Sequence, residues 1–155
     1  MNLKNHFILL LLAMLASNFA SASCSPLLDR SVRQLAEDTE VNLCEAYQGK
    51  VLLVVNTASK CGYAGQFETL EALHSEYADQ GFAVIGFPSG DFADQEYRDE
   101  NKVLEFCRLT YGVQFPMFEK SSVSGDQASP FWKELIAESG VEPRWNFYKY
   151  LICLL

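Results

Sequence analysis

The chain alternates continuous apolar runs with segments in which apolar residues recur every three or four positions. Residues 51–55 and 82–87 are apolar runs rich in β-branched side chains, which predicts strands buried on both faces of a sheet. Residues 147–155 predict a final apolar strand, and residues 113–118 predict a further short one. Residues 31–41 alternate weakly around an acidic turn and predict a modest hairpin.

Three further segments have the spacing of amphipathic helices. Residues 66–80 carry apolar side chains on one face and stop at Gly81. Residues 99–110 follow the same pattern, and Pro130 opens the third segment, residues 130–138, at a position where proline is tolerated. Strands that alternate with helices predict an α/β fold with parallel crossovers and a sheet covered on both faces.

The first two dozen residues predict an export signal. Residues 7–16 form an apolar core, and Ala20-Ser21-Ala22 forms a small-residue cleavage site. The core is too short to span a bilayer, which takes about 20 residues. We therefore expect residues 1–22 to be a signal peptide and residues 23–155 to be a periplasmic or secreted domain. A buried first helix and a lipoprotein acylated on Cys24 are the alternatives.

Charge and cysteine content narrow the possible functions. The net charge is −8 and no Lys/Arg cluster is present, so nucleic acid is not an expected partner. The cysteines include no C-x-x-C pair, and the histidines are His6 and His74, so neither a metal nor another cofactor is expected. Disulfides are permitted outside the cytoplasm, where Cys24 and Cys44 either pair or stay as buried thiols.

Cys61 stands at a chemically informative position. It follows the apolar run 51–55 by a short polar turn and precedes the helix expected at residues 66–80. In parallel sheets, chemistry collects at the carboxyl ends of the strands, and the start of a helix favours an anion. Both features favour a reactive thiolate. The alternative is a buried cysteine that acts as a small hydrophobe.

Three separate stretches carry a resemblance to a known family. They are GKVLLVVNTASKCG at residues 49–62, Phe87-Pro88 with Phe92 and Gln95-Glu96, and Trp145-Asn146-Phe147. In this order they resemble the three signatures of the glutathione peroxidase family. The resemblance implies a thioredoxin-like fold with a central mixed sheet flanked by helices.

The same resemblance implies an activity and a set of site residues. Cys61 is similar to the peroxidatic residue, and Gln95, Trp145 and Asn146 match the other members of the family's catalytic tetrad. Amide and indole groups are neutral donors that can stabilise a thiolate and a departing alkoxide. The implied enzyme is a thiol peroxidase that reduces hydrogen peroxide and organic hydroperoxides in the response to oxidative stress.

Cys107 bears on the reductant. Its context, Glu105-Phe106-Cys107, resembles the resolving thiol of the thioredoxin-dependent family members. The expected reductant is therefore a thioredoxin-like protein, with glutathione as the alternative; if Cys107 is only core filler, glutathione is favoured. The short segment between Gly125 and Trp145 resembles monomeric family members, so a monomer is expected.

The chain also departs from the family pattern. Ser89 replaces a cysteine of the second signature, and Ala64 and Tyr97 replace a usual threonine and proline, but every tetrad position is kept. Family members continue past the last motif with a strand and a terminal helix, which we expect to be missing here at a cost in stability. The alternative function is a non-catalytic, thiol-bearing fragment. A thiol–disulfide oxidoreductase is disfavoured because no C-x-x-C pair is present.

Overall fold

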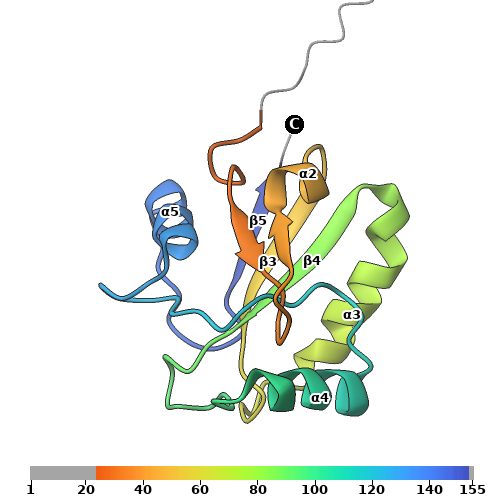
Figure 1. Ribbon diagram of the computed structural model, residues 1–155, viewed down its shortest axis with the longest axis vertical. Coiled ribbons are helices and arrows are strands. Elements are labelled where there is room, and N and C mark those ends of the chain that lie inside the picture. The colour runs from red at the N-terminus through yellow and green to blue at the C-terminus, as the bar shows by residue number, and fades with distance from the viewer. Residues whose placement is uncertain (1–23, 154–155) are drawn as a thin grey trace, which may run out of the picture.

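In the computed structural model, residues 24–153 are described, and a three-stranded mixed sheet forms the centre of the molecule (Figure 1). The strands β3 (Val51–Thr57), β4 (Phe82–Pro88) and β5 (Lys149–Cys153) lie in the order β4-β3-β5. β4 runs parallel to β3, and β5 runs antiparallel to it. The predicted central mixed sheet is confirmed. The expected signal peptide lies outside the described residues.

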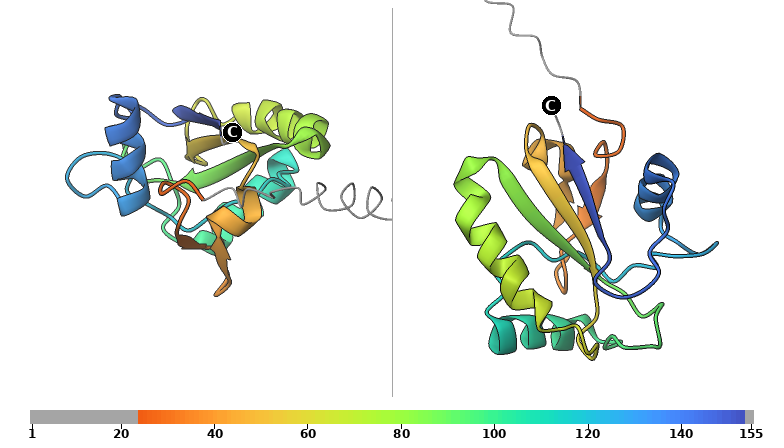
Figure 2. Two further views of the ribbon diagram at one scale, coloured as in Figure 1. Left: turned by 90° about the horizontal axis from the view of Figure 1, so that it is seen from above. Right: turned by 180° about the vertical axis from the view of Figure 1, so that it is seen from behind.

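Two layers of helices cover the sheet. Figures 1 and 2 show α3 (Gln66–Tyr77) and α5 (Pro130–Ser139) on opposite sides of it. α4 (Glu100–Tyr111) crosses the end at which β3 and β4 finish, beside the turn after β3. A single 3-10 turn, Ala78–Gln80, extends α3 and ends at Gly81 with φ 80°, where a residue without Cβ is favoured. The three predicted helices are confirmed.

The alternation of side chains along the strands creates two apolar cores. One contains Leu52, Val54 and Ile85 and packs against α5 and the N-terminal hairpin. The other contains Val55 and Val84 and packs against α3 and α4. Successive strand residues point to opposite faces, so a continuous apolar run supplies both cores at once. Cys61 and Cys107 both belong to the second core.

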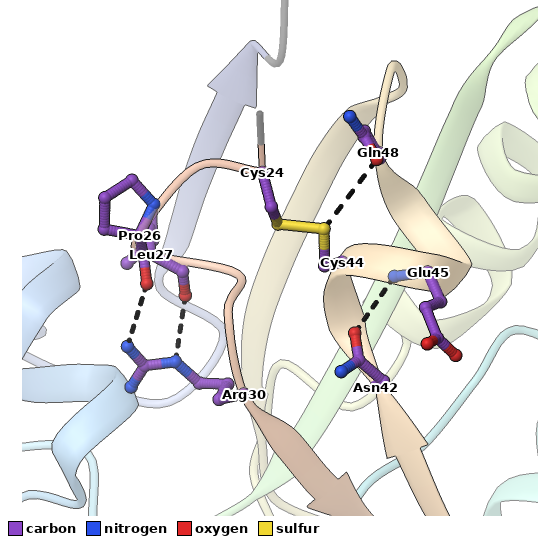
Figure 3. The surroundings of a disulfide bond; sticks show 8 residues. All are labelled: Cys24, Pro26, Leu27, Arg30, Asn42, Cys44, Glu45 and Gln48. Carbon is purple, nitrogen blue, oxygen red and sulfur yellow. Dashed lines mark hydrogen bonds between the residues drawn. A yellow bond between two sulfur atoms is a disulfide. The ribbon is translucent and has the colours of Figure 1, made fainter. Parts of the chain in front are cut away.

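The N-terminal part forms a small hairpin, as predicted, and a helix that the pattern did not reveal. β1 (Ser31–Arg33) pairs with β2 (Glu40–Asn42) antiparallel. The short α2 (Leu43–Tyr47) follows directly, and the Asn42 side chain caps it by accepting the N–H of Glu45 at 3.0 Å (Figure 3).

A disulfide joins Cys24 to Cys44 on α2, which settles the pairing that the sequence left open (Figure 3). The two Cα atoms are 5.9 Å apart, in the usual range for such bonds. The Arg30 guanidinium donates to the carbonyls of Leu27 at 2.9 Å and Pro26 at 3.4 Å and so folds the same N-terminal segment (Figure 3).

The expected strand at residues 113–118 is wrong. Only isolated bridges form there, between Met117 and Gly86 and between Phe118 and Gln34. Pro116 has no N–H for a ladder, although its carbonyl accepts the N–H of Gly86 at 2.9 Å. The segment passes so close to β4 that a Cβ on Gly86 would lie 2.3 Å from the Met117 sulfur.

A carboxylate fixes the start of α4 to the hairpin. Glu100 receives two bonds from the Arg33 guanidinium, each of 2.9 Å, and accepts the backbone N–H groups of Ala36 at 3.1 Å and Lys120 at 2.9 Å. Burial alone would raise the pKa of Glu100, but these bonds outweigh it and the pKa is lowered. The ionised form of Glu100 is therefore part of what holds α4 in place.

Candidate active site

Cys61 lies in a tight turn between β3 and α3. The Cys61 N–H donates to the carbonyl of Ala58 at 3.3 Å, and the Cys61 carbonyl accepts the N–H of Ala64 at 2.9 Å. The side chain is 6% exposed. The Tyr63 N–H points at the Cys61 sulfur at 3.4 Å. The predicted peroxidatic residue therefore lies in a turn where a backbone N–H is directed at its sulfur.

Gln95 comes from the loop after β4 and is tied to this turn. Its carbonyl accepts the N–H of Lys60, the residue before Cys61, at 2.9 Å. Its side-chain oxygen accepts a bond of 3.0 Å from the Asn146 amide, which also donates to the Phe92 carbonyl at 3.5 Å. The structure thus brings Gln95 and Asn146 into direct contact.

Trp145 lies beside the same loop. Its ring is 5.7 Å from the ring of Phe92, and 43% of its surface is exposed. Within residues 24–153, the hydrogen bond to the Cys61 sulfur comes from the Tyr63 N–H. Gln95, Trp145 and Asn146 donate no hydrogen bond to this sulfur. Gln95 and Asn146 therefore contact each other and Trp145 lies beside the same loop, but none of the three side chains donates to the Cys61 sulfur in this structure.

A residue that the sequence did not single out holds the tryptophan and the asparagine in place. Asn56, on β3, is completely buried. Its side-chain amide donates to the Trp145 carbonyl at 3.1 Å, and its side-chain oxygen accepts the Tyr148 N–H at 2.8 Å. Its backbone carbonyl accepts the Phe147 N–H at 2.7 Å. A lone amide inside an apolar strand was the available signal, because a buried amide needs partners.

The bonds from Asn56 form a clamp on residues 145–148, and the backbone of this segment is irregular ahead of the last strand. Phe147 has φ 63°, in the left-handed region, so the predicted strand at residues 147–155 begins instead at Lys149. The turn orients Trp145 and Asn146 toward the Gln95 loop and Phe147 into the core beside Phe67, with ring centroids 5.2 Å apart. The two tetrad residues consequently depend on β3 for their position.

Cys107 lies on α4, completely buried in the same apolar core as Cys61, and both thiols are free. Burial raises the pKa of Cys107 to about 12, with a smaller contribution from the charge of Glu96. Cys107 is therefore a protonated thiol at rest, and Cys61 is the better candidate for the first nucleophile. No group of three or more His, Cys, Asp or Glu side chains able to hold a metal occurs among the described residues.

The buried cysteine lies just beyond the central strand, and a pair of amide side chains lies in the loop that is bonded to the same turn, an arrangement compatible with a thiol peroxidase. The comparisons with known proteins agree. A family model for glutathione peroxidase matches residues 28–136, and the chain belongs to that family. The matched span includes Cys61, Gln95 and Cys107 and ends before Trp145.

Individual relatives and structures give the same result. The chain is 48% identical over 110 residues to the glutathione peroxidase homolog BsaA of Halalkalibacterium halodurans, covering 68% of this chain and 70% of the relative. It is 44% identical over 116 residues to a hydroperoxy fatty acid reductase of Synechocystis, covering 68% and 69%. The crystal structure of Trgpx in apo form matches with a TM-score of 0.62 and 35% identity, over 84% of this chain and 78% of that one.

Proposed function

We propose that this protein reduces hydrogen peroxide and organic hydroperoxides with Cys61 as the peroxidatic thiol. The Cys61 thiolate attacks one peroxide oxygen, and an S–O bond forms as the O–O bond breaks. The departing alkoxide or hydroxide takes up the proton that the Cys61 thiol had released, and it leaves as alcohol or water. Cys61 is then a sulfenic acid. The observation that carries this proposal is the Tyr63 N–H directed at the Cys61 sulfur in a turn to which Gln95 is bonded.

The donor roles follow from the arrangement of the amides. Asn146 donates to the side-chain oxygen of Gln95, so the nitrogen end of Gln95 remains to donate to the sulfur or to the departing oxygen. Gln95 is only half-buried, so its side chain has room to turn. Trp145 offers its indole N–H from the neighbouring position.

In the second step, Cys107 acts as the resolving thiol. Its sulfur attacks the Cys61 sulfenic acid, an S–S bond forms, the S–O bond breaks, and water leaves. A dithiol reductant then restores both thiols and is itself oxidised to a disulfide. A cysteine buried in the same core as Cys61 supports a thioredoxin-like protein as the reductant over glutathione.

Exposed aromatic rings near the site support larger substrates than hydrogen peroxide. Tyr63, two residues after Cys61, is 58% exposed, and Trp145 is 43% exposed. Such rings provide apolar contact area for the carbon chain of an organic hydroperoxide. The relative named as a hydroperoxy fatty acid reductase is compatible with this substrate class for the present chain.

The proposed setting is outside the cytoplasm, with the protein acting as a monomeric antioxidant. The Cys24–Cys44 disulfide supports export, because such bonds persist in oxidising compartments. A sulfur in a disulfide is not available for acylation, which disfavours the lipoprotein alternative. Across residues 24–153, no helix has the length and apolar character needed to cross a membrane.

The experiment that tests the function is the Cys61→Ser variant, compared with Cys153→Ser as the matched control. Cys153 is a free but exposed cysteine on β5, away from the turn after β3. Peroxide consumption with a generic dithiol reductant should disappear in Cys61→Ser and persist in Cys153→Ser, while circular dichroism shows the same fold in both. Retained turnover in Cys61→Ser would contradict the proposed peroxidatic role. The absence of turnover in the parent protein would favour the non-catalytic alternative.

A further inference from the structure

Glu96 is a buried acid that the peroxidatic chemistry described above does not use. It is 1% exposed, and among the described residues it is the one acidic or basic side chain in the fully buried set. Burying a carboxylate is costly unless hydrogen bonds compensate for the lost water. Glu96 follows Gln95 directly in the chain, so a chemical role for this buried carboxylate near the site is worth testing.

Both carboxylate oxygens of Glu96 accept backbone N–H groups. Oε2 accepts the Ser59 N–H at 3.1 Å, and Oε1 accepts the Tyr97 N–H at 2.8 Å. An ionised carboxylate suits this arrangement because it is an acceptor at both oxygens, whereas an amide would turn a donor toward one of the N–H groups. Tyr97 supplies an N–H that a proline at this position would lack.

The bonds place the carboxylate between the two segments that carry the cysteines. Ser59 lies two residues before Cys61 in the turn after β3. On the other side, the Tyr97 ring packs against the ring of Phe106, the neighbour of Cys107, with centroids 6.2 Å apart. The Cys107 thiol lies within the field of the Glu96 charge.

Two other groups set the environment of Glu96. Burial raises the pKa of its carboxyl, the bonds from Ser59 and Tyr97 partly offset that effect, and the charge of Lys120 offsets it further. Lys120 is held nearby through a bond of 2.8 Å from its ammonium to the Tyr97 carbonyl. The charged or titratable partners of Glu96 are therefore Lys120 and Cys107. A carboxylate with a raised pKa is a stronger base than an exposed one.

We propose that Glu96 accepts the proton of the Cys107 thiol when that thiol attacks the sulfenic acid on Cys61. This inference rests on the proposed function, specifically on Cys107 as the resolving thiol. The S–S bond forms, the S–O bond breaks, and the proton passes from Cys107 to Glu96 and then to the departing hydroxide, which leaves as water. Protons and electrons balance without a further reactant.

The disulfide step needs such a group. Burial raises the pKa of Cys107 to about 12, so the resting thiol has to give up its proton when it attacks. The histidine of the described region, His74, uses its Nδ1 to accept the N–H of Val84 on β4. Glu96 is the buried base next to both cysteine-bearing segments.

The test measures the two oxidation steps separately in the full-length protein. One equivalent of hydrogen peroxide is added in a stopped-flow or quenched-flow instrument. Trapping with a sulfenic-acid reagent gives the rate of Cys61 oxidation, and non-reducing peptide mapping gives the rate of Cys61–Cys107 disulfide formation. In the parent protein, the disulfide rate should rise with pH through the raised pKa of Glu96 and then level off.

Glu96→Gln should slow disulfide formation by about 10²-fold, the usual contribution of a general base, and should lose that rise with pH. Cys61 oxidation should change by less than about threefold, so sulfenic acid accumulates. Glu96→Asp, which keeps a carboxylate, should recover part of the rate. Glu105→Gln is the matched control, because it removes an exposed carboxylate from α4 two residues before Cys107.

Two outcomes would overturn the inference. One is a disulfide rate and pH profile in Glu96→Gln that match those of Glu105→Gln. The other is a uniform loss of both steps in Glu96→Gln that Glu96→Asp does not relieve, which would show that Glu96 only holds the turn. A parent protein that forms no Cys61–Cys107 disulfide contradicts the proposed function itself and is distinguishable from either outcome.

Discussion

Asn56→Ala should damage both the stability and the activity of the protein, because Asn56 connects the central strand to two tetrad residues. The substitution removes the side-chain bonds to the Trp145 carbonyl at 3.1 Å and to the Tyr148 N–H at 2.8 Å. The side chain is completely buried, so water cannot easily replace it. Removing one partner from a buried pair costs about 1–3 kcal/mol.

Two such losses give about 2–4 kcal/mol when some relaxation is allowed, a large share of the about 5–15 kcal/mol that stabilises a typical domain. The effect on catalysis follows from position. Trp145 and Asn146 would no longer be held toward the Gln95 loop, and a misplacement of about 1 Å commonly costs about 10²-fold in rate. We therefore expect the rate of Cys61 oxidation to fall by roughly 10- to 100-fold.

Urea unfolding followed by circular dichroism gives the free energy of unfolding, and sulfenic-acid trapping gives the oxidation rate. Asn101→Ala is the control, since Asn101 is an exposed asparagine on α4 and its removal should change stability by less than about 0.5 kcal/mol. Matching unfolding midpoints and oxidation rates for the two variants would refute the idea that Asn56 is a clamp.

Three further outcomes are expected. Replacing Cys24 and Cys44 by serine opens a loop with a sequence separation of 20 and should lower the free energy of unfolding by about 3 kcal/mol, measured by urea titration, with little change in Cys61 oxidation. The folded-state pKa of Glu100 is lowered, so its ionised carboxylate stabilises the folded protein above the ordinary carboxyl pKa, and this contribution is lost as pH falls through the lowered value. Glu100→Gln should therefore be less stable than the parent at pH 7 and equal to it in acid. Ala93 has φ 57°, which costs a residue with a Cβ about 1–2 kcal/mol, so Ala93→Gly should leave thermal stability unchanged or raised. Ala72→Gly, at an exposed position of α3, should instead lower stability by about 1 kcal/mol.

The elements that the sequence predicted well are those whose apolar pattern is long. β3, β4, α3, α4 and α5 lie close to the predicted residues, because each buries a continuous run or a helical stripe. The short α2 was missed, since its five residues are too few to show a period and its cap is a local side-chain bond. Residues 113–118 are apolar enough for a strand, but Pro116 and the close approach to Gly86 limit them to isolated bridges.

For the candidate site, too, the sequence could indicate some residues but not the contacts that hold them. Motifs could indicate Cys61, Gln95, Trp145 and Asn146. In the structure, Asn146 bonds to Gln95, and the Gln95 carbonyl bonds to the residue before Cys61. The contacts that hold them are long-range: Asn56 reaches the segment before β5, and Glu96 reaches back to Ser59. A single sequence does not specify such pairings, because they depend on how distant loops meet at the end of the sheet.

The most direct test of this mechanism is a peptide map of the parent protein after one equivalent of peroxide. We predict an intramolecular disulfide between Cys61 and Cys107, with Cys153 unmodified and the Cys24–Cys44 bond unchanged. Accumulation of Cys61 as sulfinic acid with Cys107 still a thiol would contradict the resolving role, and an unmodified Cys61 would contradict the peroxidatic role.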